Sequence, residues 1–380
     1  MKIAVIVGTR PEAVKMAPVH RALVAANLEP ELISTGQHLD LLRSALVPLQ
    51  VVPAYELALM TPNQTPNGIA SLILERMPPL LIEIKPAAVL VQGDTTTAFA
   101  TALAAYHLGI PVGHVEAGLR TYDDLNPFPE EANRQLIARL TRWSFAPTEL
   151  AKQNLLAERI DAGRIHVTGN TAVDSVLWML EHRDEPASAP EHAPYLLLTL
   201  HRRESFGEPL RDILGAVTDF LVCEPAAEVV WPVHPNPAVR ALATELFEHH
   251  PRVHLVAPLD YDVFASTLAD ARTILSDSGG VQEEAPSLGK RVLIARETTE
   301  RPEAVHSGHN VIVGRERARI RSALLAAWHD PPYRGPLPSP NPYGDGHAAT
   351  RIAKILTNDL VPWIDKATEA GSIAPAVLAS

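Results

Sequence analysis

Two series of short apolar runs, each alternating with helix-forming stretches, constrain the fold of this chain more than any other feature. The first run, Lys2–Val7, is what we expect of a strand buried on both faces of a parallel sheet. Gly8-Thr9-Arg10 then turns the chain, and Pro11 suits the first turn of a helix reaching about Ala26. Further strands are expected at Leu32–Thr35, at Val89–Val91, from Val112, around Phe145, and at His166–Val167, Tyr195–Thr199, Val229–Val233, Val253–Val256, Thr273–Leu275 and Val292–Ile294. This alternation predicts an α/β fold of doubly wound parallel sheets.

The 380 residues are too many for one ordinary core and indicate two domains. A polar, Pro-rich stretch at 181–194 marks a loop near their boundary, and 331–342 is a second loop. We predict a first Rossmann-like domain over 1–170, a second over 171–356 with a last helix at about 347–356, and a tail over 367–380. Two such domains would leave an interdomain cleft between their strand ends, suited to a ligand with two different halves. The alternative is one Rossmann domain joined to a separate catalytic domain.

Composition excludes several classes of protein. A net charge of -11 argues against a nucleic-acid binder, so an anionic ligand would need a local cluster of cations and helix ends. Cys223 is the single cysteine, which excludes an intrachain disulfide and a four-cysteine metal site. Neither the GxGxxG turn of nicotinamide enzymes nor a Walker P-loop follows an expected strand. The N-terminal apolar run is too short for a signal peptide, and no run of 18 apolar residues exists, so we expect a soluble, cytoplasmic protein.

Three carboxylates follow two neighbouring expected strands and the Pro-rich loop after them. Asp94 and Glu116 stand where the two strands end, and Glu130, followed by Glu131, begins the next helical segment. Ligands bind outside the carboxyl ends of parallel strands, and clustered acids shift one another's pKa as proton transfer requires. For any one of them alone we favour a structural role: Asp94 and Glu130 as helix caps, and Glu116 as the partner of Arg120. For all three at one edge we favour function.

A second cluster predicts an anion site. A strand, a turn at Gly279-Gly280 and a helix follow one another, and backbone N–H groups at such a turn bind anions, although a lone Gly-Gly turn is usually only a turn. His201-Arg202-Arg203 follows another strand, and three adjacent cationic groups would repel one another unless an anion were near. Further candidates are Arg10, Lys15, His234, Glu284 and Arg301, each with an alternative as a solvated, hydrogen-bonded or salt-bridged structural residue.

With these residues together, the chain strongly resembles the non-hydrolysing UDP-N-acetylglucosamine 2-epimerases. The resemblance runs in one order from residue 8 to residue 346, which makes it far more specific than any single motif. The matching segments are GTRPEAVKMAP from Gly8, QGDTTTAFA from Gln92, PVGHVEAGLRT from Pro111, PFPEEANRQL from Pro127, TGNTAVD from Thr168, HRRESFG from His201, SDSGGVQEEAPSLGK from Ser276, TTERPEAV from Thr298 and NPYGDG from Asn341.

The resemblance implies the GT-B architecture of two Rossmann-like domains, with a C-terminal helix at about 357–366 packing back on the first. It implies interconversion of UDP-N-acetylglucosamine and UDP-N-acetylmannosamine by elimination of UDP, giving 2-acetamidoglucal, and its re-addition. It also implies service to cell-surface polysaccharide synthesis, a homodimer, and no metal or organic cofactor. The implied catalytic residues are Asp94, Glu116, Glu130 and His201. The implied substrate contacts are Arg10, Lys15, Arg134, Phe264, Ser278, Gly279, Gly280, Glu284 and Arg301.

The chain also departs from this family. Of a second UDP-N-acetylglucosamine site in regulated members it keeps Gln37, Arg202 and His234, but Asp40 stands where a glutamine is expected and Asn63 near an expected arginine. An Asp beside a diphosphate is electrostatically unfavourable, so we expect weakened or absent substrate activation. Competing functions are a hydrolysing relative that releases N-acetylmannosamine and UDP, a UDP-sugar glycosyltransferase, which needs no three acids, and a non-catalytic UDP-sugar sensor.

Overall fold

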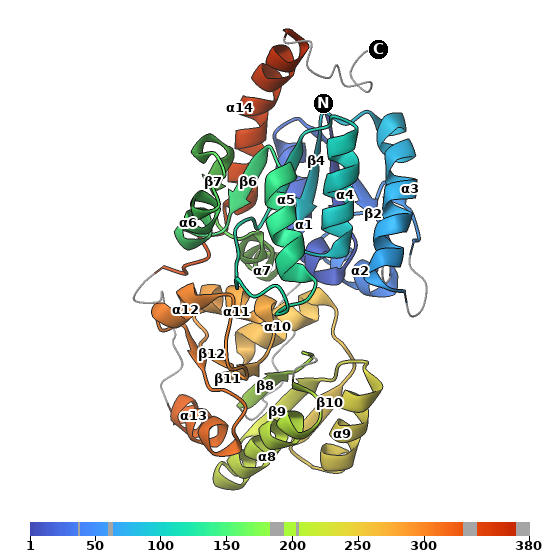
Figure 1. Cartoon of the computed structure of the whole chain (residues 1–380). Helices are drawn as coiled ribbons and strands as arrows, with labels where there is room; N and C mark the ends of the chain where they lie inside the picture. The colour runs from blue at the N-terminus through green and yellow to red at the C-terminus, as the bar shows by residue number, and fades with distance from the viewer. Residues whose placement is uncertain (37–38, 60–63, 183–193, 203–204, 330–339, 370–380) are drawn as a thin grey trace. The chain divides into compact units, whose positions relative to one another are not determined.

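The computed structural model describes residues 1–36, 39–59, 64–182, 194–202, 205–329 and 340–369 (Figure 1). The chain divides into two compact units. Unit 1 is Met1–Ser175 together with the chain from Tyr343, and unit 2 is Val176–Pro342. Each unit holds its own parallel sheet with alternating helices, which confirms the predicted fold class. None of the described helices is long and apolar enough to cross a membrane.

The sheet of unit 1 has its strands in the order β3-β2-β1-β4-β5-β6-β7, all parallel. The strands are β1 (Lys2–Val7), β2 (Glu29–Ser34), β3 (Tyr55–Glu56), β4 (Ala88–Gln92), β5 (Val112–Val115), β6 (Trp143–Ala146) and β7 (Ile165–Val167). The helices are α1 (Arg10–Ala25), α2 (Leu39–Leu46), α3 (Pro66–Ile84), α4 (Thr96–His107), α5 (Glu130–Leu140), α6 (Glu149–Ala157), the first part of α7 (Thr171–Glu181) and α14 (Ala348–Glu369). The chain winds outward from the centre in both directions, so β1 and β4 flank the topological switch point where ligands bind in such sheets.

Unit 2 repeats this plan with the order β10-β9-β8-β11-β12-β13. Its strands are β8 (Tyr195–Thr199), β9 (Glu228–Pro232), β10 (Val253–Val256), β11 (Thr273–Ser276), β12 (Val292–Ile294) and β13 (Asn310–Ile312). Its helices are α8 (Glu208–Cys223), α9 (Pro237–Phe247), α10 (Tyr261–Asp270), α11 (Gly279–Glu284), α12 (Pro302–His306) and α13 (Arg317–His329). The switch point of this sheet lies between β8 and β11.

Each sheet is covered by apolar helix faces, as its continuous apolar strands require. In unit 1, α3 buries Ile73, Met77 and Leu81 in a core that includes the inner strands. In unit 2, Phe220 of α8 meets Trp328 of α13 edge to face, with ring centroids 5.1 Å apart. These side chains hold the helices in place and leave the loops at the carboxyl ends of the strands to carry the chemistry.

Helix α14 closes unit 1. It packs against α1, and the buried Asp174 carboxylate accepts hydrogen bonds from the backbone N–H groups of Ala348 (3.2 Å) and Ala349 (2.8 Å) at its start. Trp143 of β6 donates to Asp359 further along the helix at 3.3 Å. The helices expected at about 347–356 and 357–366 are one helix ending at residue 369, and it belongs to unit 1, whereas the second domain was predicted to run to 356. Of the tail expected over 367–380, residues 367–369 belong to this helix and the rest lies outside the described residues.

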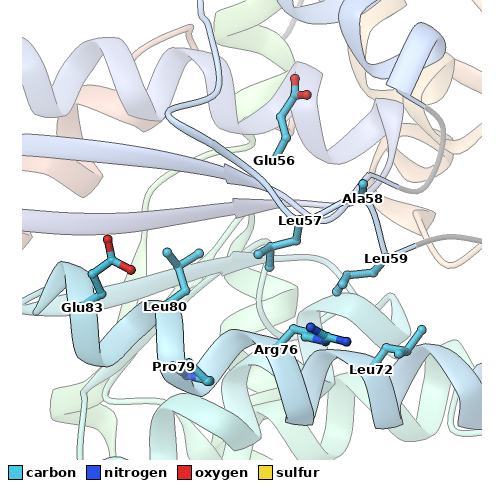
Figure 2. A pocket seen from close by; sticks show the side chains of 9 residues that line it. All are labelled: Glu56, Leu57, Ala58, Leu59, Leu72, Arg76, Pro79, Leu80 and Glu83. Carbon is cyan, nitrogen blue, oxygen red and sulfur yellow. The ribbon is translucent and has the colours of Figure 1, made fainter.

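A pocket of about 680 Å³ lies at the β3 edge of the unit 1 sheet (Figure 2). Its walls are the segment that follows β3 and the facing side of α3. The lining residues are Glu56, Leu57, Ala58, Leu59, Leu72, Arg76, Pro79, Leu80 and Glu83. These residues lie two strands away from the switch point and include none of the residues that the sequence predicts for the site.

Candidate functional site

The switch point of unit 1 is held together by a buried glutamate. Glu12, on the first turn of α1, accepts hydrogen bonds from the N–H groups of Gly8 (2.9 Å) and Thr9 (2.6 Å) and from the Thr95 hydroxyl (2.6 Å). Thr9 in turn caps the helix by accepting from the Glu12 N–H, which completes a capping box. Burial raises the pKa of Glu12 and outweighs the opposing effect of these hydrogen bonds. One carboxyl group therefore joins the loop after β1 to the loop after β4.

Glu116 lies buried at the end of β5 among three donors. The Lys15 ammonium lies 2.6 Å from its Oε1, the Asn170 amide donates to the same oxygen at 3.3 Å, and the Gln92 amide donates to Oε2. The backbone of Glu116 is left-handed, with φ of 66°, a conformation that costs a non-glycine residue energy and is found at functional sites. The alternative pairing with Arg120 is wrong, because Arg120 forms a bidentate ion pair with Glu158 instead.

Asp94 lies in the turn after β4, which needs Gly93 for its positive φ of 69°. Arg134 of α5 donates to Asp94 Oδ2 at 2.5 Å, and the Asn133 amide donates to the Asp94 carbonyl at 2.9 Å. Asp94 does not cap α4, because Thr95 occupies that position. With 27% of its side chain exposed, the Asp94 carboxylate is open to a ligand while its charge is compensated.

A buried histidine holds the turn at Gly93 and Asp94 through a hydrogen bond. His114 of β5 is completely buried, and its Nε2 lies 2.7 Å from the Gly93 carbonyl oxygen, so Nε2 carries the proton and donates. Burial, aided by the charges of Arg120 and Arg134, lowers the pKa of His114 to about 4, although the hydrogen bond to Gly93 opposes the shift. His114 is therefore neutral at physiological pH and fixes the position of the Asp94 turn.

The Pro-rich loop delivers two glutamates with different surroundings. Glu131 is fully buried and accepts hydrogen bonds from the Thr121 N–H and hydroxyl (both 3.0 Å) and from the Tyr122 N–H (3.3 Å), so it organises the loop. Glu130, half-exposed at the first position of α5, stands one helical turn before Arg134 and shares its face. Of this pair, Glu130 is the more exposed side chain.

In unit 2, the loops after β8 and β11 meet at the switch point. The fully buried Asp277 follows β11, and the half-exposed His201 follows β8, with 3.1 Å between Asp277 Oδ1 and His201 Nδ1. Burial raises the pKa of Asp277, but the hydrogen bond and charge of His201 and the backbone N–H groups of Arg202 and His201 outweigh it and hold that pKa below its usual value. The sequence predicts an anion beside the run that begins at His201, and the Asp277 carboxylate supplies part of that negative charge.

His234 lies beside His201. It follows β9, its ring stacks on that of His201 with centroids 6.1 Å apart, and its Nδ1 accepts from the Asn236 N–H at 3.2 Å. Burial lowers the pKa of His234, as does the charge of His201, while Asp277 opposes both. Nε2 is therefore the protonated nitrogen of His234, and the two rings form one surface at this sheet edge.

The Gly279-Gly280 turn lies against a buried guanidinium. A Cβ at position 279 would come within 2.8 Å of the Arg301 guanidinium, so only glycine allows this approach. Arg301 donates to Glu283 Oε1 at 2.5 Å and pairs with Glu300, which also receives Arg296 (2.9 Å). Burial raises the pKa of Glu300, but the charges of Arg301, Arg296 and Arg202 outweigh it and hold the pKa well below its usual value. The salt-bridged structural alternative for Arg301 is therefore observed, although its side chain makes no capping hydrogen bond at the start of α12.

The remaining predicted residues lie on α11, on α10, on α1 or outside the described part of the chain. Ser278 and Gly280 stand at the start of α11, Glu284 is buried at its end, and Phe264 of α10 packs half-buried against the core of unit 2. Arg10 is the first residue of α1, beside the switch point of unit 1. The side chains of Gln37, Asp40, Asn63 and Arg203 lie outside the described part of the chain.

Four side chains at the two switch points were not predicted individually. They are Glu12, Gln92, Asn170 and Asp277. The Thr9-x-x-Glu12 spacing of a capping box could have identified Glu12, and the position directly after an apolar strand could have drawn attention to Gln92 and Asp277. For Asn170 no local pattern exists, because its partner Glu116 lies 54 residues away in the chain.

Known proteins of one family match this chain over almost its whole length. The family model described as UDP-N-acetylglucosamine 2-epimerase matches residues 21–357. The curated Escherichia coli (strain K12) UDP-N-acetylglucosamine 2-epimerase is 44% identical over 377 residues, covering 95% of this chain and 100% of its own.

Solved structures agree in both sequence and fold. The Neisseria meningitidis UDP-GlcNAc 2-epimerase, solved bound to UDP-GlcNAc, superimposes with a TM-score of 0.88 at 41% identity, covering 94% of this chain and 100% of its own. The Methanocaldococcus jannaschii UDP-GlcNAc 2-epimerase, solved with UDP-GlcNAc and UDP, gives a TM-score of 0.83 at 34% identity with the same coverage. The predicted resemblance and the GT-B class are confirmed. The chain belongs to the UDP-N-acetylglucosamine 2-epimerase family.

Proposed function

We propose that this chain epimerises UDP-N-acetylglucosamine to UDP-N-acetylmannosamine at carbon 2 of the sugar, as an isomerase. The observation that carries the proposal is the arrangement at the unit 1 switch point, where Asp94 and Glu116 each lie beside a cation. Carboxylates at the carboxyl ends of neighbouring strands are placed as proton carriers for a sugar. Their arrangement supports proton transfer, which a binding protein alone would not need.

The chemistry requires more than one proton carrier. Carbon 2 bears an acetamido group with no adjacent carbonyl, so its hydrogen is not acidic. Elimination of UDP breaks the bond from carbon 1 to the diphosphate oxygen and the bond from carbon 2 to hydrogen, forming 2-acetamidoglucal. The electron pair of the carbon 1–oxygen bond leaves with UDP, and the pair of the carbon 2–hydrogen bond forms the double bond between carbons 1 and 2. A carboxylate takes the proton. Re-addition of UDP with protonation on the opposite face completes the epimerisation, so one carboxyl group must serve each face.

We assign these proton transfers to Asp94, Glu116 and Glu130. Lys15 lies beside the buried Glu116 and Arg134 beside Asp94, so each of these two acids has a cation within ion-pair distance. Glu130 is half-exposed on the same face of α5 as Arg134, which suits exchange of a proton with a ligand.

The diphosphate of the leaving UDP is assigned to groups of unit 2. His201, with 39% of its side chain exposed, can donate to a phosphate oxygen, and donors aimed at developing charge stabilise a transition state. The other substrate contacts proposed from the family are Arg10, Lys15 and Arg134 in unit 1 and Phe264, Ser278, Gly279, Gly280, Glu284 and Arg301 in unit 2. Arg301 lies under the Gly279 turn and contributes positive charge there.

Three further proposals follow from the family. The enzyme works as a homodimer, for which the expected result is twice the chain mass in solution. It works in the cytoplasm on a nucleotide sugar for polysaccharide synthesis, which fits a chain with one cysteine. Substrate activation is weak or absent because of Asp40 and Asn63, so initial rates should rise hyperbolically with substrate, and strongly sigmoidal rates would contradict this.

Separation of the products of purified protein and UDP-N-acetylglucosamine tests the proposed reaction. We expect UDP-N-acetylmannosamine to accumulate to a constant ratio with UDP-N-acetylglucosamine, and the same ratio to be reached from either direction. Steady release of N-acetylmannosamine and UDP would instead identify a hydrolysing enzyme. Binding of UDP with no product would identify a sensor and overturn the proposal.

A further inference from the structure

Asp277 makes several hydrogen bonds to the segment after β8 at the unit 2 switch point. Its carboxylate accepts from the His201 N–H at 3.0 and 3.1 Å, from the Arg202 N–H at 3.0 Å and from the Ser205 hydroxyl at 3.2 Å. Oδ1 also lies 3.1 Å from His201 Nδ1. A single carboxylate on the loop after β11 therefore holds both the backbone and the ring of the residue after β8.

The position of Asp277 is itself fixed by the sheet. Its N–H donates to the Thr199 carbonyl at 3.1 Å, continuing the parallel ladder of β8 and β11, and the Thr199 and Ser276 hydroxyls lie 2.6 Å apart beneath it. The Asp277 side chain is completely buried. A carboxylate anchored in this way is a rigid support for a partly exposed ring.

The contact at Nδ1 determines what the other ring nitrogen can do. A carboxylate only accepts hydrogen bonds, so the nitrogen that faces it must carry a proton. When His201 carries both ring protons, Nδ1–H donates to Asp277, and Nε2–H is left to donate to an anion. Among the described residues, His234 stacks on this ring, with ring centroids 6.1 Å apart. The guanidinium of the next residue, Arg202, lies 3.4 Å from Glu300. Asp277 is thus the anion that compensates positive charge on His201.

We propose that Asp277 is a positioning residue for the epimerisation: it fixes the Nδ1 proton of His201 and aims Nε2 at the departing diphosphate. This inference rests on the proposed function, in which UDP leaves and returns. During elimination the electron pair of the carbon 1–oxygen bond passes to the diphosphate, and the Nε2–H of His201 faces the growing negative charge. Asp277 itself touches neither substrate nor product.

The substitution Asp277→Asn tests the proposal in the full-length protein. An amide can still accept from the backbone, but it no longer compensates charge on His201. We expect kcat to fall about 100-fold with KM changed less than about 3-fold, since orientation and charge of a catalytic histidine act mainly in the transition state. The control Ser205→Ala removes one contact to Asp277 without touching His201, and we expect its kcat to stay within about 3-fold of the unmodified enzyme.

Two further measurements separate positioning from a merely structural role. The double variant His201→Asn with Asp277→Asn should be no slower than His201→Asn alone, because the two residues act as one unit. Nitrogen-15 NMR of the ring, assigned by the signal lost in His201→Asn, should show a proton on Nδ1 in the unmodified protein, with and without UDP. In Asp277→Asn that proton should move to Nε2, whereas Ser205→Ala should keep the original spectrum.

The outcomes are distinct even if a variant fails to fold. An unprotonated Nδ1 in the unmodified protein would overturn the proposal without any variant. It would also be overturned if the losses from His201→Asn and Asp277→Asn multiplied, or if Asp277→Asn slowed the enzyme and left the ring spectrum unchanged. If the unmodified protein forms no UDP-N-acetylmannosamine, the proposed function fails, whereas the ring spectra still report whether Asp277 fixes the tautomer.

Discussion

Lys15 Nζ and Glu116 Oε1 lie 2.6 Å apart, with only 7% and 5% of their side chains exposed. The pair joins the first turns of α1 to the end of β5 across the switch point of unit 1. Together with the pair of Arg134 and Asp94, it shows that these two acids each have a cation of their own. The sequence predicted acids that shift one another's pKa, whereas the structure places a cation beside each of these two acids.

Replacement of Lys15 should destabilise the fold and slow the reaction. Lys15→Met leaves the buried Glu116 carboxylate without its cation, which we expect to lower the free energy of unfolding by about 3 kcal/mol. Urea unfolding measures this loss. The matched control is Lys2→Met, which removes an exposed pair with Glu31 at 3.9 Å worth less than about 1 kcal/mol. Equal stability of the two variants would contradict the importance of the buried pair.

Asp94→Asn should separate binding from turnover. The amide keeps the shape of the side chain but cannot accept a proton, so we expect kcat to fall by a factor of roughly 100 to 10,000. UDP affinity, measured by calorimetry, should change less than about 3-fold, because UDP lacks the sugar on which this group acts. Asp212→Asn, on the exposed face of α8, is the control and should leave both quantities unchanged. A fully active Asp94→Asn enzyme would remove Asp94 from the mechanism.

The two arginines of this region should behave differently. The buried Arg120 forms a bidentate pair with the partly exposed Glu158 at 2.6 and 2.9 Å, so Arg120→Met should cost about 1 to 3 kcal/mol of stability with little change in kcat. Arg134 contacts Asp94, and Arg134→Met should lower kcat at least about 10-fold. Urea unfolding and steady-state kinetics on both variants check this. A slow but stable Arg120→Met enzyme would reverse the assignment.

His114 should make stability depend on pH. Its pKa is about 4 in the folded chain and near 6.5 in the unfolded chain, so between these values the unfolded chain binds the additional proton. Stability from this group is fully present above pH 6.5 and is lost as the pH falls toward 4, by up to about 3 kcal/mol. Urea midpoints of the unmodified protein and His114→Gln, compared between pH 4.5 and 7.5, should converge as the pH falls. A constant difference across this range would contradict the buried, neutral histidine.

Much of the architecture could be predicted because its signals are local. Continuous apolar runs located the strands Tyr195–Thr199 and Val253–Val256 with the bounds observed. The two-residue β3 has no such run and was missed. It is defined only by its pairing with the neighbouring β2, at Tyr55 and Glu56. Helix α14 extends beyond the end predicted at 356, and contacts with distant segments, such as Trp143 with Asp359, have no local signal in the sequence.

The site could be predicted only by position. Asp94, Glu116 and His201 were expected just after strands, and the structure places them after β4, β5 and β8, near the two switch points. Their partners could not be derived, because Lys15 and Glu116 are separated by 101 residues and His201 and Asp277 by 76. Contacts between distant segments depend on the packed fold, so the pairing of charges became visible only with the structure.

The central claim is that carbon 2 of the sugar loses and regains a proton, and proton NMR in deuterated water tests it most directly. The purified protein is mixed with UDP-N-acetylglucosamine, and the signals of both sugars are followed with time. We predict growth of UDP-N-acetylmannosamine with deuterium in place of hydrogen at carbon 2. UDP-N-acetylmannosamine that keeps its original hydrogen there, or an unchanged spectrum from protein that binds UDP, would contradict the account.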